Sequence, residues 1–186
     1  MHVLSLRKFR RFLKDSKAGV LIEMAMVTPV LMIILMGGFE TARYIYTNQK
    51  IQRTAMSLAD LAARGKTMTA IDINNLFAAA DEVAKPFNIS SDGRVFVSSV
   101  IDDGTGAPEV AWQRGAGAIA ATSTVGIEGG AATISDAFLI QNDQSVIVTE
   151  IFYDYQPFFA SFLTGGTLYH QATYRPRLSR TVELLP

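Results

Sequence analysis

One apolar segment near the start of the chain, from Ala18 to Phe39, restricts the possible folds more than any other feature. It contains 22 residues and a single charged side chain, Glu23. At a helical rise of about 1.5 Å per residue the segment would be roughly 33 Å long, close to the roughly 30 Å thickness of the hydrocarbon core of a bilayer. The sequence therefore predicts a membrane-inserted protein.

The charges on either side of this segment predict its orientation. The residues before it include one acid, Asp15, and six basic side chains: Arg7, Lys8, Arg10, Arg11, Lys14 and Lys17. Of the 17 basic and 17 acidic residues in the chain, 11 basic and 16 acidic ones therefore lie outside this leader, so the net charge of zero conceals a strong asymmetry. By the positive-inside rule we expect a cytoplasmic N-terminus and an exported C-terminal bulk.

A secretory signal peptide is the alternative explanation for residues 1–39, because it also joins a basic start to an apolar run. The run is longer than a usual signal-peptide core, contains a carboxylate and has no Ala-x-Ala cleavage site before the helical sequence that follows. We therefore expect the segment to be retained. Glu23 lies about one turn into it, so its carboxylate either reaches the cytoplasmic interface or pairs with a charge on a neighbouring subunit.

The composition limits what the 147 residues after Phe39 can form. They suffice for one compact domain, and the absence of cysteine leaves its stability to hydrophobic packing. No basic patch is present outside the leader, which argues against nucleic-acid binding, whereas the leader itself suits anionic lipid. The two histidines, His2 and His170, form neither a two-histidine metal cluster nor an evident triad, so we expect no metal, no cofactor and no catalytic residue.

The first helix is expected to continue beyond the membrane and to end near Gly65. Apolar residues recur there with the period of one helix face: Tyr44, Ile51, Ala55, Leu58 and Ala62. A helix from about Gly19 to Arg64 would be roughly 69 Å long. A second helix is predicted over Ala70 to Ala84, because Thr69 and Asp72 resemble a capping pair.

The rest of the chain predicts a small sheet. Alternating side chains indicate strands over Arg94 to Ile101, Gln144 to Tyr155 and Leu168 to Leu178, with Glu109 to Arg114 returning as a hairpin partner after the turn at Asp102, Asp103 and Gly104. Residues 115–137 are rich in small side chains and predict a long surface loop. The predicted fold class is α+β: a long N-terminal transmembrane and trunk helix, then a small head with one further helix and a largely antiparallel sheet.

Two groups of side chains in the predicted head have more than one interpretation. The first is an aromatic set around Pro157: Tyr153, Tyr155, Phe158, Phe159, Phe162 and Tyr169. These residues belong to the core, to the outer membrane interface or to an interaction patch, and core is favoured. The second group, Asp102, Glu150 and Asp154, would serve an exported hydrolase only if the fold brought the acids together, which is the least favoured function.

The run from Lys14 to Ala55 resembles the N-terminal signature of the TadE-like family, minor pseudopilins of the tight-adherence (Tad, or Flp) pilus system. The shared features are the basic leader, Glu23, the proline within the span and the Gly-Phe-Glu-x-x-Arg-Tyr exit that begins at Gly38. Farther on, VIVTEIFYDYQPFF and YHQATYRPR are similar to the strands that end many members.

The resemblance implies cleavage by a membrane prepilin peptidase on the cytoplasmic side, which leaves the glutamate fifth in the mature chain. Counting back from Glu23 places the processing site between Ala18 and Gly19, with alanine where the family usually has glycine before the bond. Cleavage after Gly19 is the alternative, which would satisfy the glycine preference but make Glu23 the fourth residue of the mature chain. Glu23 could then pair with the terminal amine of the next subunit.

The resemblance thus predicts a non-enzymatic, single-pass protein of the bacterial cytoplasmic (inner) membrane that helps to assemble, prime or regulate a tight-adherence pilus. We divide the chain into a leader, 1–18, a transmembrane and trunk helix, 19–65, and a periplasmic head, 66–186. Expected partners are other pilins or pseudopilins, the prepilin peptidase, pilus assembly platform proteins and membrane lipid. The alternative is a single-span, membrane-tethered binding or adhesin module with an uncleaved leader.

Overall fold

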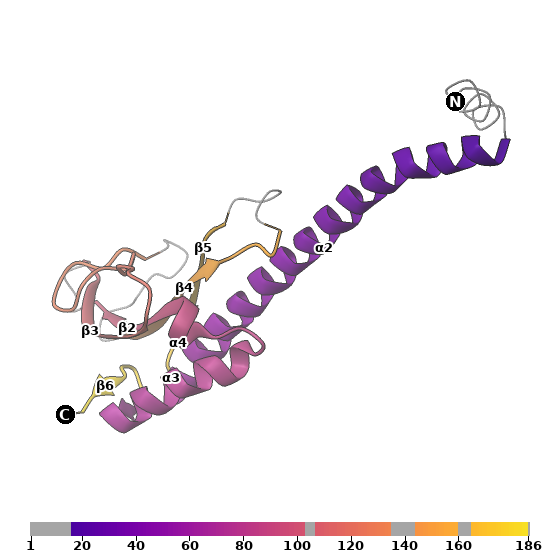
Figure 1. Cartoon of the computed structure of the whole chain (residues 1–186). Helices are drawn as coiled ribbons and strands as arrows, with labels where there is room; N and C mark the ends of the chain where they lie inside the picture. Colours follow the sequence, from indigo (N-terminus) through magenta and orange to yellow (C-terminus); the bar gives the residue numbers. More distant parts are fainter. Residues whose placement is uncertain (1–15, 103–106, 135–143, 160–164, 186) are drawn as a thin grey trace, which may run out of the picture.

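The computed structural model describes residues 16–102, 107–134, 144–159 and 165–185. A long helix, α2 (Ser16–Ala62), carries the other elements along its second half, while its first half projects away from them (Figure 1). The predicted leader up to residue 15, the turn residues Asp103 and Gly104, loop residues 135–137 and Phe162 lie outside the described part of the chain.

The first half of α2 has no protein around it within the described residues. The helix runs through Pro29 without interruption, and residues 19–35 are all exposed. This stretch passes the length and hydropathy test for a membrane span, with a mean hydropathy of 2.3 and none of it buried in the chain. Because exposing so much apolar surface to water is unfavourable, the helix fits a bilayer or an assembly of like helices.

The second half of α2 belongs to the core. The residues predicted to form its apolar face are fully buried, with the exception of Tyr44: Ile51, Ala55, Leu58 and Ala62 are each 0 % exposed. They pack against strand residues such as Ile147 and Ile151 and against α3. Helix and head therefore share one hydrophobic core rather than touching at a hinge.

The sheet has four antiparallel strands in the order β3-β2-β4-β5. The strands are β2 (Gly93–Ile101), β3 (Glu109–Gly117), β4 (Ser145–Tyr155) and β5 (Gly166–Tyr174). Strand β4 is interior, which suits its apolar composition, and β5, the strand before Pro176, lies at an edge, where a following proline costs no ladder hydrogen bond. Helix α3 (Ala70–Ala84) begins with the expected capping box between Thr69 and Asp72. The long helix, the second helix and the antiparallel sheet together confirm the predicted α+β class.

Three short elements had no signal in the sequence. Strands β1 (Thr67–Met68) and β6 (Glu183–Leu184) pair in parallel, and α4 (Ile89–Asp92) follows α3. The Asp81 carboxylate on α3 accepts hydrogen bonds from the backbone N–H groups of Ile89 and Ser90, at 2.8 and 2.9 Å, and so fixes the start of α4.

The predicted loop over residues 115–137 needs correction. Its first three residues complete β3, where Gly117 has a φ of +123° and a Cβ atom would lie 2.3 Å from the Gly93 carbonyl oxygen. Residues 118–134 then cover the sheet face that is turned away from α2, and Val125 is fully buried there with Val110 and Val148. A stretch without periodicity thus supplies the cover for a second, smaller core.

Candidate functional site

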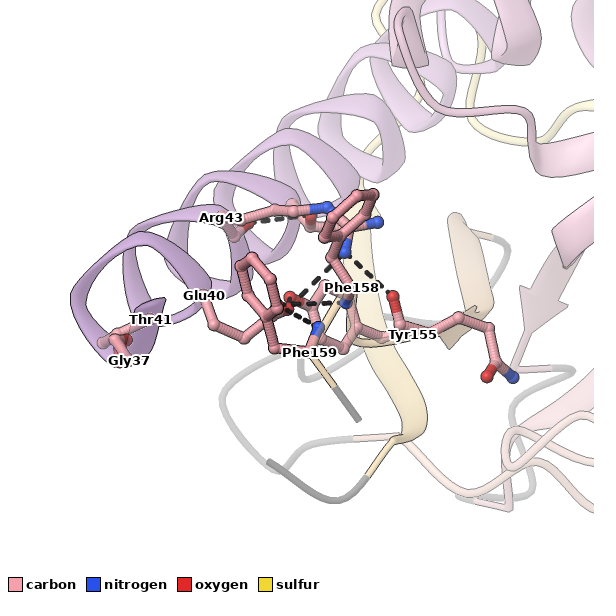
Figure 2. Close-up of polar contacts among 9 residues, drawn as sticks. Gly37, Glu40, Thr41, Arg43, Tyr155, Phe158 and Phe159 are labelled. Atoms are coloured by element: carbon pink, nitrogen blue, oxygen red, sulfur yellow. Dashed lines mark hydrogen bonds and ion pairs between the residues drawn. The ribbon is translucent and has the colours of Figure 1, made fainter. Parts of the chain in front are cut away.

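A buried carboxylate lies directly after the apolar segment. Glu40 is 0 % exposed although its neighbour on α2, Phe39, is 57 % exposed. Burying an ionised carboxylate is costly unless its oxygens accept hydrogen bonds. The chain meets this requirement by bringing the end of β4 and the residues after it onto the helix (Figure 2).

Glu40 accepts four hydrogen bonds from three directions. The Tyr155 hydroxyl donates to Oε1, and the backbone N–H groups of Phe158 and Phe159 each donate to Oε2 at 3.0 Å. Arg43, one turn along the helix, contacts Oε1 at 3.5 Å. We call this group, Glu40, Arg43, Tyr155, Gln156, Phe158 and Phe159, the exit clamp.

Arg43 strengthens the exit clamp from the solvent side. Its Nη1 donates to the Gln156 carbonyl oxygen at 3.0 Å, and its guanidinium lies 5.3 Å from the centre of the Tyr155 ring, within the range of a cation–π contact. Burial, followed by the hydrogen bond and negative charge of Glu40, raises the pKa of Tyr155 to about 12. The phenol therefore stays protonated and remains a hydrogen-bond donor at neutral pH.

The exit clamp is suited to mechanical coupling rather than to chemistry. The Glu40 oxygens are occupied by donors of the same chain and are shielded from solvent, so a substrate has no access to them. Three of the four donors, on Tyr155, Phe158 and Phe159, lie more than 110 residues away in the chain. The clamp therefore joins the head rigidly to the helix at the point where the apolar segment ends.

A second buried acid, Glu150 on β4, is used in a similar way. Its carboxylate accepts hydrogen bonds from the Thr124 N–H at 2.9 Å and from the Tyr169 hydroxyl at 3.0 Å, and the hydroxyls of Ser123 and Thr124 also donate to it. These contacts hold the 118–134 segment on the sheet.

The fold does not bring the three acids of the hydrolase alternative together. Asp102 follows the end of β2 that pairs with Ser145, whereas Asp154 lies beside the opposite end. Eight residue steps along a strand separate the two ends, roughly 25 Å. Glu150 is enclosed by the 118–134 segment, and Asp154 accepts a hydrogen bond from Gln156 at 2.7 Å.

The structure places the predicted processing and contact residues on the free half of α2. Ala18 and Gly19 lie in the first turns of the helix, and Glu23 is exposed one turn further on. Within the described part of this single chain, Glu23 makes no ion pair. Glu40 is part of the Gly-Phe-Glu-x-x-Arg-Tyr motif, but no role is predicted for it from the sequence. The sequence feature that points to its role is an acid directly after the apolar segment and three residues before an arginine, a spacing that places both side chains on one helix face.

The predicted aromatic set divides between core and surface. Tyr153 and Tyr155 are buried, as favoured, whereas Phe158 is 73 % exposed and Tyr169 is 38 % exposed. Phe159 stacks edge-on between Phe39 and Phe158, with ring centres 6.2 and 5.1 Å away.

His170 links strand β5 to helix α2 through a side-chain hydrogen bond. Its Nε2 lies 2.8 Å from Oδ1 of Asn48 on α2, and burial lowers its pKa below the ordinary value of 6.5. Between about pH 7.5 and about pH 5.5 the unfolded chain therefore binds a proton more readily than the folded one, so stability should fall as the pH falls. Urea unfolding of wild type and His170→Gln at both pH values tests this. The variant should lose much of the pH dependence, and an identical dependence would contradict the assignment.

The described structure defines a class of protein: a single long helix with a free apolar half, clamped to an α+β head that shares its core. The apolar helix points to a single-pass membrane protein. Residues 19–60 match the family described as TadE-like protein, which confirms the resemblance over the anchor and most of α2. The matched segment includes both Glu23 and Glu40. Comparison with curated proteins and with solved structures gave no match.

Proposed function

We propose that this chain is a pseudopilin-like subunit that helps to assemble, prime or regulate a tight-adherence pilus. The family match suggests a subunit associated with that pilus system. In the proposed arrangement the N-terminus lies in the cytoplasm, the first half of α2 crosses the inner membrane and packs with other pilins or pseudopilins, and the head makes contacts in the periplasm. We retain the proposed division into 1–18, 19–65 and 66–186.

One observation carries this proposal: the family match coincides with a helix whose apolar half is left uncovered by the described head, with every residue from 19 to 35 exposed. A helix that spans a bilayer and associates laterally needs this surface, with small residues that permit close approach. Gly19, Gly37 and Gly38 supply such positions, since nothing in the described chain lies within 4 Å of a Cβ built on any of them.

The exit clamp supports a subunit role over a loosely tethered one. A rigid connection transmits the position and rotation of the helix to the head, which an assembly with fixed helix register requires. The alternative, a membrane-tethered binding or adhesin module, has no such requirement and would keep its leader uncleaved. Under either function, we expect no cofactor, no metal and no nucleic acid.

Processing is the first test of the proposal. The full chain is expressed with and without a prepilin peptidase, and the mature N-terminus is read by mass spectrometry. We expect peptidase-dependent cleavage between Ala18 and Gly19, with Gly19 as the new terminus, or with Val20 as the new terminus if the cut follows Gly19. An intact N-terminus beside a peptidase that cuts a known prepilin would favour the tethered module.

Glu23 gives a second test, because an intersubunit ion pair fixes register between packed helices. Glu23→Gln should reduce pilus output strongly and leave membrane insertion unchanged, as measured by alkaline extraction. Met26→Leu, on the same exposed half of the helix, is the control and should leave both unchanged. Normal pilus output from the Glu23 variant would contradict the predicted contact.

A further inference from the structure

The exit clamp holds an exposed aromatic residue outside the core. Phe158 is 73 % exposed although its backbone N–H is fixed 3.0 Å from the buried Glu40 carboxylate. A large aromatic side chain held in this way gains little from the fold of its own chain, because most of its apolar surface remains uncovered. Figure 2 shows it beside the helix with Phe159.

Three aromatic rings lie together at this point, and we call them the exit aromatics: Phe39, Phe158 and Phe159. The Phe39 and Phe159 rings are 6.2 Å apart and the Phe158 and Phe159 rings are 5.1 Å apart, both edge to face. Phe39 is the last residue of the apolar segment and is 57 % exposed. Phe158 and Phe159, which follow β4, therefore extend the apolar surface of α2 beyond the helix itself.

The position of this surface along the helix identifies its surroundings. Glu40 directly follows the apolar segment, and the Phe158 backbone N–H donates a hydrogen bond to its carboxylate. Phe158 therefore lies at the depth where α2 would leave the hydrocarbon core of the bilayer. Arg43 follows Phe39 by four residues, about 6 Å along the helix axis, and its side chain is 33 % exposed. Phenylalanine side chains on the apolar side of a segment with arginine or lysine on its polar side are typical of the boundary between acyl chains and headgroups.

We infer that the exit aromatics form a second membrane contact, in which Phe158 inserts between lipid headgroups of the leaflet on the head side. This inference rests on the membrane-spanning part of the proposed function. The continuity of the aromatic surface with the span, together with Arg43 at phosphate depth, favours lipid over a protein partner. With two points of attachment, α2 and Phe158, the head is fixed in tilt and rotation relative to the membrane surface.

Depth-dependent fluorescence quenching tests the inference. The full chain carrying Phe158→Trp is reconstituted into phosphatidylcholine and phosphatidylglycerol vesicles that contain a nitroxide either near the headgroup or near the end of the acyl chain. Wild type supplies the background, since Trp112, the single tryptophan, is 4 % exposed within the head core. Ile127→Trp is the matched control, because Ile127 is 75 % exposed on the segment that covers the far face of the sheet.

The shallow nitroxide should quench Phe158→Trp at least about twofold more than the deep one, as expected for a residue at the interface. Ile127→Trp should be quenched no more than wild type. Equal quenching of the two variants in protein that resists alkaline extraction would overturn the inference and leave the span intact. Emission from Phe158→Trp that depends on protein density but not on the nitroxide would assign the ring to contact with another copy, and so would also overturn it. Failure of the protein to insert would overturn both this inference and the proposed anchor.

Discussion

Replacing Glu40 with alanine should lower the free energy of unfolding of the head by about 3–5 kcal/mol, because several hydrogen-bond donors lose their shared acceptor. The change leaves the N–H groups of Phe158 and Phe159 and the Tyr155 hydroxyl without their acceptor. Each buried donor without a partner costs about 1–3 kcal/mol. Urea unfolding in detergent, followed through the emission of the buried Trp112, measures the loss.

Two further variants make this result specific to the exit clamp. Glu40→Gln keeps an acceptor oxygen and should lose less stability than Glu40→Ala. Glu82→Ala removes a glutamate whose side chain is 72 % exposed and forms a surface ion pair with Lys85, so its effect should stay within about 0.5 kcal/mol. A loss for Glu40→Ala no greater than that for Glu82→Ala would show that the carboxylate does not hold the head to the helix.

Truncation of Leu58 to alanine should cost about 2–5 kcal/mol, the range found for buried leucines. The Leu58 side chain is 0 % exposed and belongs to the core that joins α2, α3 and the sheet. A cavity at this position removes contacts on the helix and on the head together. We therefore expect one cooperative transition at a lower urea midpoint, measured by the same fluorescence assay.

Leu61→Ala is the matched control for this experiment. Leu61 lies three residues farther along α2 and is 42 % exposed, so the same truncation should cost less than about 1 kcal/mol. Equal losses at the two positions, or a second transition in which α2 separates from a folded sheet, would contradict the shared core.

Features that depend on neighbouring residues could be predicted from the sequence. Hydropathy identified the apolar half of α2, and the helical period identified Ile51 and Leu58 as core residues. The pair Thr69 and Asp72 marked the start of α3, and alternating side chains marked β4 as a strand. In each case local spacing alone determines which side chains share a face.

The 118–134 segment shows where this local information ends. Its small residues have no period, because its role is to lie across the outer face of a finished sheet rather than to form an element of its own. Only the tertiary structure brings Ser123 and Thr124 to Glu150 and buries Val125. The short strands β1 and β6 are similar, since two residues carry no pattern until the chain ends meet.

The candidate site, too, has features that follow from the local sequence and features that depend on the tertiary structure. The sequence by itself determined an apolar anchor with an acid within it, Glu23, and another acid at its exit, Glu40, because composition and spacing are properties of a continuous segment. The tertiary structure alone decided that Glu40 is buried, since its hydrogen-bond donors at Tyr155, Phe158 and Phe159 are more than 110 residues away and reach it only after β4 has packed on α2. Hydrogen-bond partners over such separations are set by topology, and no local pattern encodes them.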